Sequence, residues 1–135
     1  MSSSKILITI SRIILPFLIM FGLYIIVNGD SSVGGGFQGG VIMSTSYLLY
    51  YFITGKHPFS LTEMLKIDKL LFLALPLFIG ASFITRGELF TNLFSVEQDY
   101  ETRRMFLVAL NLLIGAKVAL GFVSLFYIFI EEGNN

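Results

Sequence analysis

The sequence predicts an all-α fold: an integral membrane bundle of four transmembrane helices, forming a single domain over residues 1–135. Three observations support this prediction. Hydrophobic residues make up 55% of the 135 residues, and charged residues only 13%. The mean hydropathy of +0.81 lies far above that of a soluble domain. Four apolar runs are separated by polar segments, and a hydrocarbon core about 30 Å thick needs about 20 apolar residues per helix.

The first apolar run covers about residues 6–27 and is long enough to cross the membrane. Arg12 lies near its start, where a long side chain can reach the headgroups. A secretory signal peptide also combines a basic start with an apolar core, but this run is too long and no small-residue cleavage site follows it. We therefore expect a retained helix that ends at the polar turn from Asn28 to Asp30.

A glycine-rich stretch at residues 33–40 leads into the second predicted span, about residues 37–54. Glycine permits positive φ and close backbone approach, so such a cluster is expected where the chain bends tightly or packs against another element. Irregular backbone inside a membrane is tolerated only where protein or water surrounds it. The sequence predicts a structured hinge between the first two helices, covered by other helices.

Residues 54–66 read as a polar loop with a short interfacial turn, in which Ser60 or Thr62 can act as the cap. His57 lies in this loop and is interpreted either as an ordinary loop histidine or as a proton-handling group near the membrane surface. The third predicted span, about residues 67–85, has Asp68 at its start and a kink at Pro76.

Residues 86–104 form the longest polar segment, and part of it is predicted to lie along the interface as an amphipathic piece. The fourth predicted span follows at about residues 105–130. Lysines and arginines flanking the spans are more numerous on the side that carries both termini, which predicts cytoplasmic termini in a prokaryotic cell membrane.

Several classes of protein are disfavoured by composition. The net charge is zero, so no basic surface suggests nucleic acid as a partner. Cysteine is absent and His57 is the only histidine, which argues against a disulfide, an iron–sulfur cluster, a bis-histidine haem or a cysteine-based zinc site. No nucleophile has a neighbouring base, and no His, Asp and Glu set has metal-ligand spacing. We expect no enzyme activity, cofactor or metal in this chain.

Lys117 is the one ionisable residue deep inside a predicted helix. A charge near the bilayer centre is expensive, so such a residue usually faces the protein interior, pairs with a partner or marks an ion pathway. Asp68 lies only at the start of a span, and the sequence offers no obvious buried counter-charge. We expect the partner to be another subunit or a water wire, or the lysine to be neutral at rest and able to relay a proton.

Two faces of the fourth helix follow from the helical period of 100° per residue. Lys117, Gly121 and Ser124 share one face. Asn111, Gly115 and Ala119 share another, which suits close helix packing, with Asn111 able to hydrogen-bond across it. Asn111 and Lys117 do not point the same way, which disfavours a single site containing both. The predicted residues of an ion path or subunit contact are Lys117, Asn111, Ser124 and His57.

The glycine stretch carries a motif, Gly34-Gly35-Gly36-Phe37-Gln38-Gly39-Gly40. By itself such a cluster either cradles an anion or packs tightly at a subunit contact, and the missing phosphate-binding motif favours packing. The motif, the chain length and the four spans resemble the B subunit of the multisubunit Mrp-type sodium/proton antiporters, the MnhB family, which has a Gly-Gly-Gly-Phe-x-Gly-Gly signature after its first helix. The resemblance covers most of the chain and is weak at residues 86–104.

The resemblance implies a small accessory membrane subunit that is needed for assembly and contributes to ion passage, with large antiporter-like subunits elsewhere in the complex. Sodium ions and protons would pass through that complex, and membrane lipid would surround it. Related subunits occur beside hydrogenase and sulfane-sulfur reductase modules, and residues 111–118 look more like those versions. Lys117 would then belong to the ion path or anchor a neighbouring subunit.

Two alternatives remain open. One is a purely structural scaffold, whose glycine hinge and small-residue helix faces hold larger subunits together. The other is a stand-alone four-helix transporter, for which one buried charge offers few ligands to a cation that prefers several oxygens.

Overall fold

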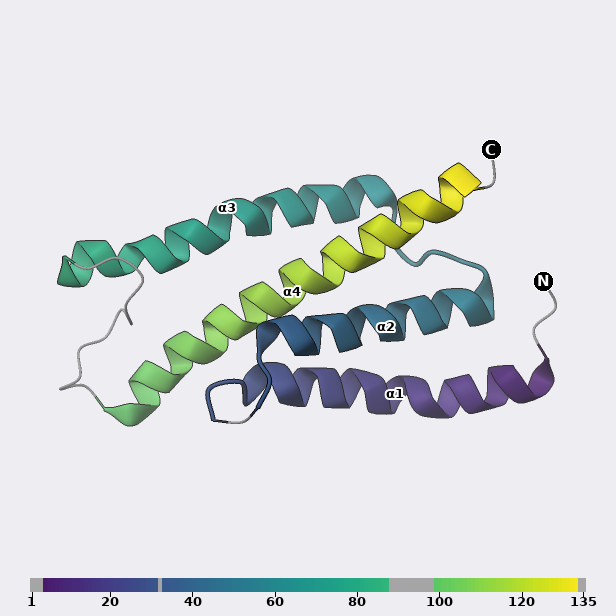
Figure 1. Ribbon diagram of the computed structural model, residues 1–135, viewed down its shortest axis with the longest axis horizontal. Helices are drawn as coiled ribbons and strands as arrows, with labels where there is room; N and C mark the ends of the chain where they lie inside the picture. The colour runs from purple at the N-terminus through teal and green to yellow at the C-terminus, as the bar shows by residue number, and fades with distance from the viewer. Residues whose placement is uncertain (1–3, 32, 88–98, 134–135) are drawn as a thin grey trace.

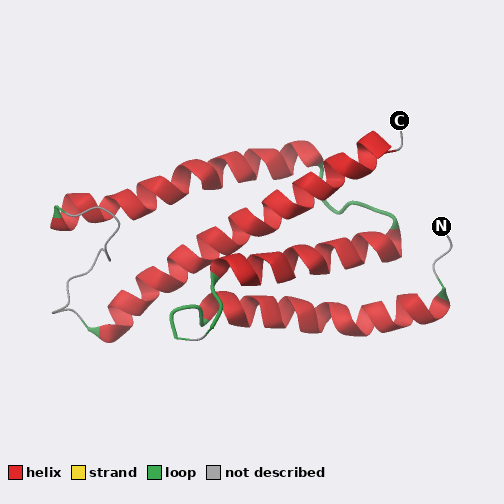
Figure 2. Ribbon diagram, viewed as in Figure 1, coloured by secondary structure: helices red, strands yellow, loops and turns green. Residues whose placement is uncertain are grey.

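The computed structural model describes residues 4–31, 33–87 and 99–133 of the chain. Within these ranges the ordered structure consists of four α-helices and contains no strand (Figures 1 and 2). The helices are α1 (Lys5–Val27), α2 (Gly36–Thr54), α3 (Leu61–Arg86) and α4 (Tyr100–Gly133). This confirms the predicted all-α, four-helix class. The amphipathic piece predicted within residues 86–104 lies largely outside the described residues.

Helix α4 joins the two halves of the bundle. It packs against α1, α2 and α3, whereas among the described residues the backbone of α3 comes close to neither α1 nor α2. Figure 1 shows α4 running diagonally between α3 on one side and the α1–α2 pair on the other. The start of α1, the end of α4 and the α2–α3 connection all lie at one end of the bundle.

Local signals explain where the helices begin and end. The Ser60 hydroxyl accepts a hydrogen bond from the Glu63 backbone N–H at 3.3 Å, and the Glu63 side chain accepts from the Ser60 N–H, which forms a capping box. Helix α3 therefore starts at Leu61, ahead of the predicted span, and takes in the residues read as a separate interfacial turn. Helices α2 and α3 end at Gly55 and Gly87, both left-handed.

The glycine stretch divides into a turn and a helix. Gly34 and Gly35 adopt φ of 145° and 148°, which only glycine tolerates readily, and they complete the turn after α1. The remaining residues of the motif, from Gly36 onward, form the first turns of α2. Only the first part of the stretch is thus irregular backbone.

Small residues let α1, α2 and α4 approach one another closely. A Cβ added at Gly40 would lie 2.6 Å from the carbonyl oxygen of Gly115 on α4, and one added at Gly115 would lie 2.7 Å from Cδ1 of Ile26 on α1. A Cβ added at Gly22 on α1 would lie 3.2 Å from the Gly39 carbonyl oxygen. Close approach at small residues is typical of helices in membranes. We call these contacts between α1, α2 and α4 the glycine junction, formed by Gly22, Gly36, Gly39, Gly40 and Gly115.

Few large apolar side chains are buried. The buried hydrophobic residues are Ile26, Met64, Phe106 and Val123, whereas many large apolar side chains of α1 and α3 are exposed. A water-soluble monomer rarely exposes so much apolar surface. By length and composition, α1 and α4 could each cross a membrane.

Candidate functional site

An ion pair joins α3 to α4 near the middle of α4. The ammonium group of Lys117 donates to Asp68 Oδ1 at 2.5 Å, and the two side chains are only 26% and 21% exposed. The Phe72 ring, one turn further along α3, lies 5.8 Å from Lys117 Nζ, within reach of a cation–π interaction. The lysine is therefore partnered within its own chain.

This pair corrects the expectation that the chain offers Lys117 no buried counter-charge. The sequence predicts Asp68 at the start of the third span, away from the middle of the fourth. The capping box at Ser60 starts α3 earlier, so Asp68 lies about 10 Å inside the helix at a rise of 1.5 Å per residue. Antiparallel packing then brings it opposite Lys117.

A second group gathers around His57 at the end of the bundle where α4 finishes. The imidazole lies between two tyrosine rings, with centroid distances of 4.2 Å to Tyr51 on α2 and 3.9 Å to Tyr127 on α4. The Tyr47 hydroxyl is 3.4 Å from His57 Nδ1 and donates to it when that nitrogen is unprotonated. We call these four residues the His57 cluster.

The charge state of His57 is set by burial and one carboxylate. Partial burial lowers the pKa of His57 below its ordinary value of 6.5, because desolvation disfavours the imidazolium. The negative charge of Glu131, near the end of α4, opposes part of that shift. His57 thus titrates below neutral pH while it is in contact with both α2 and α4.

Ser124 differs from the two buried serines of α2. Ser44 and Ser46 on α2 donate to the carbonyl three residues earlier, at 2.7 Å in each case. The Ser124 hydroxyl is also buried, yet it has no hydrogen-bond partner among the residues that the structure describes. A buried hydroxyl without a partner is costly, so this position calls for an explanation.

Asn111 belongs to the glycine junction and not to the ion pair. Its Oδ1 accepts a hydrogen bond from the Gly36 backbone N–H at 3.3 Å, and Gly36 is the first residue of α2. Asn111 thereby satisfies, from α4, an N–H that a helix N-terminus leaves without an internal partner. Within the motif, Phe37 is exposed and makes an edge contact with Phe122 of α4 at 6.5 Å, and Gln38 is exposed.

A second ion pair lies at the opposite end of the bundle. Arg104 Nε donates to Asp30 Oδ2 at 3.1 Å, and the Asp30 side chain is only 4% exposed. It ties the turn after α1 to the first turns of α4.

Sequence reasoning missed Asp68, the tyrosines and Glu131 as site residues, and it did not single out the Asp30–Arg104 pair. Spacing could have found some of them. Tyr47 and Tyr51 are one helical turn apart, and Glu131 is two heptads from Lys117.

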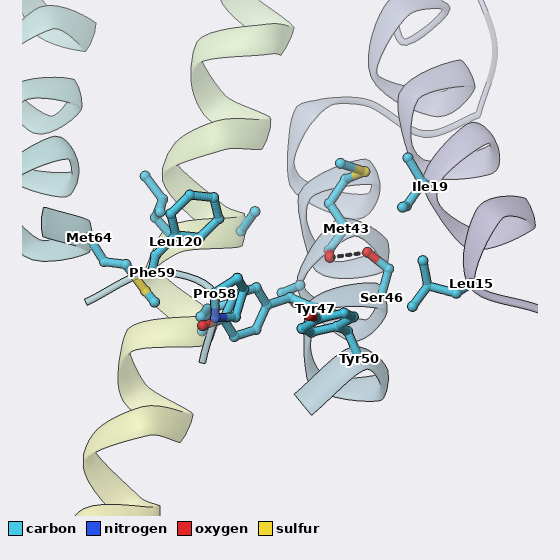
Figure 3. Close-up of a pocket in the computed structure, with 13 residues that line it drawn as sticks. Leu15, Ile19, Met43, Ser46, Tyr47, Tyr50, Pro58, Phe59, Met64 and Leu120 are labelled. Atoms are coloured by element: carbon cyan, nitrogen blue, oxygen red, sulfur yellow. Dashed lines mark hydrogen bonds between the residues drawn. The ribbon is translucent and has the colours of Figure 1, made fainter. Parts of the chain in front are cut away.

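An apolar pocket of about 410 Å³ opens between α1, α2 and α4. Figure 3 shows Leu15 and Ile19 of α1 on one side. Met64 of α3, Phe59 and Leu120 of α4 lie on the other. No charged residue lines this pocket, and the Ser46 hydroxyl beside it is bonded to the Met43 carbonyl. The pocket offers lipid or protein an apolar surface but offers an ion no ligand charge.

The fold and these contacts define a class: an all-helical membrane protein whose ionisable groups meet between helices. The profile of the MnhB family, described as a domain related to the MnhB subunit of Na+/H+ antiporter, matches residues 6–124. The chain belongs to this family. Membership points to a component of a transporter.

Individual relatives align with only part of the chain. The "Putative antiporter subunit mnhB2" of Staphylococcus haemolyticus (strain JCSC1435) is 30% identical over 95 residues, which cover 62% of this chain and 66% of that protein. The protein of the same name from Staphylococcus epidermidis (strain ATCC 12228) is 27% identical over 89 residues, 59% of this chain and 63% of that protein. The aligned regions span less than two thirds of these relatives. No solved structure matches the chain.

Proposed function

We propose that this chain is a multi-pass subunit of a prokaryotic cation/proton antiporter module, and that the Lys117–Asp68 pair lies on the ion path of that module. In this proposal all four helices cross the membrane and both termini are cytoplasmic. The observation that carries it is the pair itself, because two opposite charges largely shielded from water between helices of a membrane protein are expensive and usually functional.

The pair can respond to a passing ion in a simple way. Moving one proton from the ammonium group to the carboxylate turns the ion pair into a neutral pair, with no change in total charge. A cation approaching the carboxylate would compete with Lys117 for it, since both are attracted to the same oxygens. Either event alters the contact that holds α3 on α4.

The partners follow from the same proposal. The chain assembles with the larger membrane subunits of an antiporter module, and Na+ and H+ cross the assembled complex. A hydrogenase-like redox module joined to that complex is the finer version, supported only by the likeness of residues 111–118 to such subunits. Purification of a tagged chain in mild detergent, followed by mass spectrometry of the proteins that accompany it, tests both versions. Antiporter subunits alone would indicate an antiporter without a redox module, whereas additional redox subunits would indicate a joined redox module.

A purely structural scaffold is the second candidate, favoured by the glycine junction and by the Asn111 cap on α2. The two candidates differ in what Lys117→Met does in inverted membrane vesicles containing the whole complex. The ion-path role predicts an assembled complex whose Na+-driven proton flux is lost. Normal flux in Lys117→Met, together with failed assembly when Gly36 or Gly39 is made bulky, would establish the scaffold and refute the ion path.

A further inference from the structure

Helix α4 carries three polar residues at heptad spacing. Lys117, Ser124 and Glu131 are each seven residues apart, so each step turns 700° and returns within about 20° of the same line. They form a stripe along the side of α4 that runs from the Lys117–Asp68 pair to the end of the helix. We call it the polar stripe.

Helix α3 and the segment before it follow this side of α4 in antiparallel register. Phe78 stacks on Phe106 at 5.0 Å, Asp68 bonds to Lys117, and His57 contacts Tyr127. Residue numbers fall along α3 and the segment before it as they rise along α4. The line of contact between them, which we call the seam, therefore runs from the phenylalanine pair through the ion pair to the His57 cluster. The two ionisable sites of the bundle are thus connected by one helix seam.

The middle of the seam has a buried hydroxyl without a partner, beside a glycine that faces open space. Ser124 is 5% exposed, and its Oγ has no hydrogen-bond partner in the described part of the chain. A Cβ placed on Gly121, one turn earlier on the same side of α4, would meet no atom within 4 Å. Bridging Ser124 to the pair, about 10 Å away along the helix axis, takes a chain of water molecules along this open side of α4.

The far end of the seam has the groups that proton exchange requires. His57 is partly exposed, and imidazole is the side chain that best accepts and releases protons near neutral pH. The titratable groups that face it are Tyr47 and Tyr51 from α2 and Tyr127 and Glu131 from α4. On the α3 side, Glu63 is bonded to Ser60 in the capping box.

We propose that the polar stripe and His57 form a proton-exchange path between the Lys117–Asp68 pair and the end of the bundle where α4 finishes. This inference rests on the proposed function. A proton enters on His57, moves along bridging water, and crosses the Ser124 hydroxyl, which accepts one proton as it donates another. It ends on the Asp68 carboxylate, so the net change is one proton moved from the aqueous surface to Asp68.

The test uses inverted membrane vesicles that contain the whole complex, with Na+-driven proton flux followed by a pH-sensitive dye between about pH 6 and 8.5. Ser124→Ala and His57→Gln should each slow the flux by about tenfold or more, as loss of a proton-transfer group does. Ser46→Ala is the matched control, since this buried serine on α2 donates within its own helix and lies off the seam. It should stay within about twofold of the unmodified complex.

Two further measurements separate a path from a packing role. If Ser124 served only packing, Ser124→Ala would remove an unsatisfied hydroxyl, and both flux and thermal stability would hold or improve. The path predicts lost flux at unchanged stability. Ser124→Thr, which restores the hydroxyl, should recover flux; a Thr variant as slow as the Ala variant would overturn the proposal.

The Lys117→Met variant of the complex separates a failure of the proton-exchange path from a failure of the proposed function. If Ser124→Ala and His57→Gln transport normally at every pH while Lys117→Met abolishes flux, the path is wrong and the ion-path role of the pair stands. If Lys117→Met and Asp68→Asn also transport normally in an assembled complex, the proposed role of the pair fails and the path fails with it.

Discussion

A lysine and a carboxylate that are mostly shielded from water depend on each other for their stability. Lys117 and Asp68 are each about a quarter exposed, which places the pair between a surface ion pair and a buried one. Removing one partner leaves an uncompensated charge between α3 and α4. Removing both leaves an apolar contact that lipid and protein tolerate well.

Asp68→Leu or Lys117→Met alone should therefore lower the free energy of unfolding by about 1–3 kcal/mol, and the double variant should recover most of that loss. Thermal unfolding of the purified complex in detergent, read by release of this subunit, measures the cycle. Additive losses in the double variant would show that the two charges do not stabilise each other.

His57 makes a signed prediction about pH. Burial lowers the pKa of His57 in the folded chain, so between that pKa and the ordinary value of 6.5 the unfolded chain binds more protons. The free energy of unfolding should be level above about pH 6.5 and fall as the pH drops below it. His57→Gln should flatten this dependence. Melting temperatures at pH 5.5 and 7.5 give the comparison.

Glu131 supplies the control for that prediction. Its carboxylate raises the pKa of His57, opposing the larger effect of burial. In Glu131→Gln the pKa of His57 should fall further and the loss of stability in acid should grow. A smaller acid loss in this variant would contradict the assignment.

At the scale of helices, the glycine junction decides how α1, α2 and α4 pack. Gly40→Ala would place a Cβ 2.6 Å from the Gly115 carbonyl oxygen, and backbone cannot yield as a flexible side chain can. We expect a loss of about 1–3 kcal/mol and a reduced amount of the subunit in membranes. Gly80→Ala in α3 is the matched control, because its Cβ meets no atom within 4 Å and alanine is the better helix former. Immunoblots of membranes from cells that express each variant separately check this prediction. Equal amounts of the two variants would show that the close contacts of the glycine junction do not stabilise the subunit.

Hydrophobic runs were sufficient to predict four helices, because burial in lipid or protein requires runs of that length. They could not locate the start of α3, since the capping box depends on Ser60 and Glu63 and not on hydropathy. Hydropathy also gives no sign that Asp68 lies opposite Lys117. The unusual position of Lys117 was visible from its depth in an apolar run, whereas Asp68 and the His57 cluster depend on how α3 and α2 pack on α4. Pairing between distant residues cannot be read from one sequence.

For the molecule as a whole, α3 is the helix that packs against a single neighbouring helix. Among the described residues its backbone packs closely only against α4, along a seam that contains the Lys117–Asp68 pair and the stacked Phe78 and Phe106. Helices α1 and α2, by contrast, are held to α4 by close glycine contacts. A change in the charge of the pair would therefore be transmitted first to α3, and through its exposed apolar face to whatever packs there.

The orientation of the bundle gives the last prediction. The start of α1, the α2–α3 connection and the end of α4 lie at one end, close to Lys5, Lys56 and Lys66, and positive residues favour the cytoplasmic side (Figure 1). The chain has no cysteine, so single cysteines report position cleanly. With a membrane-impermeant maleimide, Ser31→Cys should react in intact cells, whereas Thr62→Cys and Glu132→Cys should react only after permeabilisation.

The pattern of labelling separates two kinds of error. Ser31 lies after α1, Thr62 in the first turn of α3 and Glu132 at the end of α4, so four crossings place the last two on the same side and the first on the other. A reversed pattern would keep four crossings and invert the orientation, which would leave the His57 cluster on the outer face. Labelling of Thr62 and Glu132 from opposite sides would mean that α3 and α4 do not both cross, and the ion pair could not then lie within the membrane.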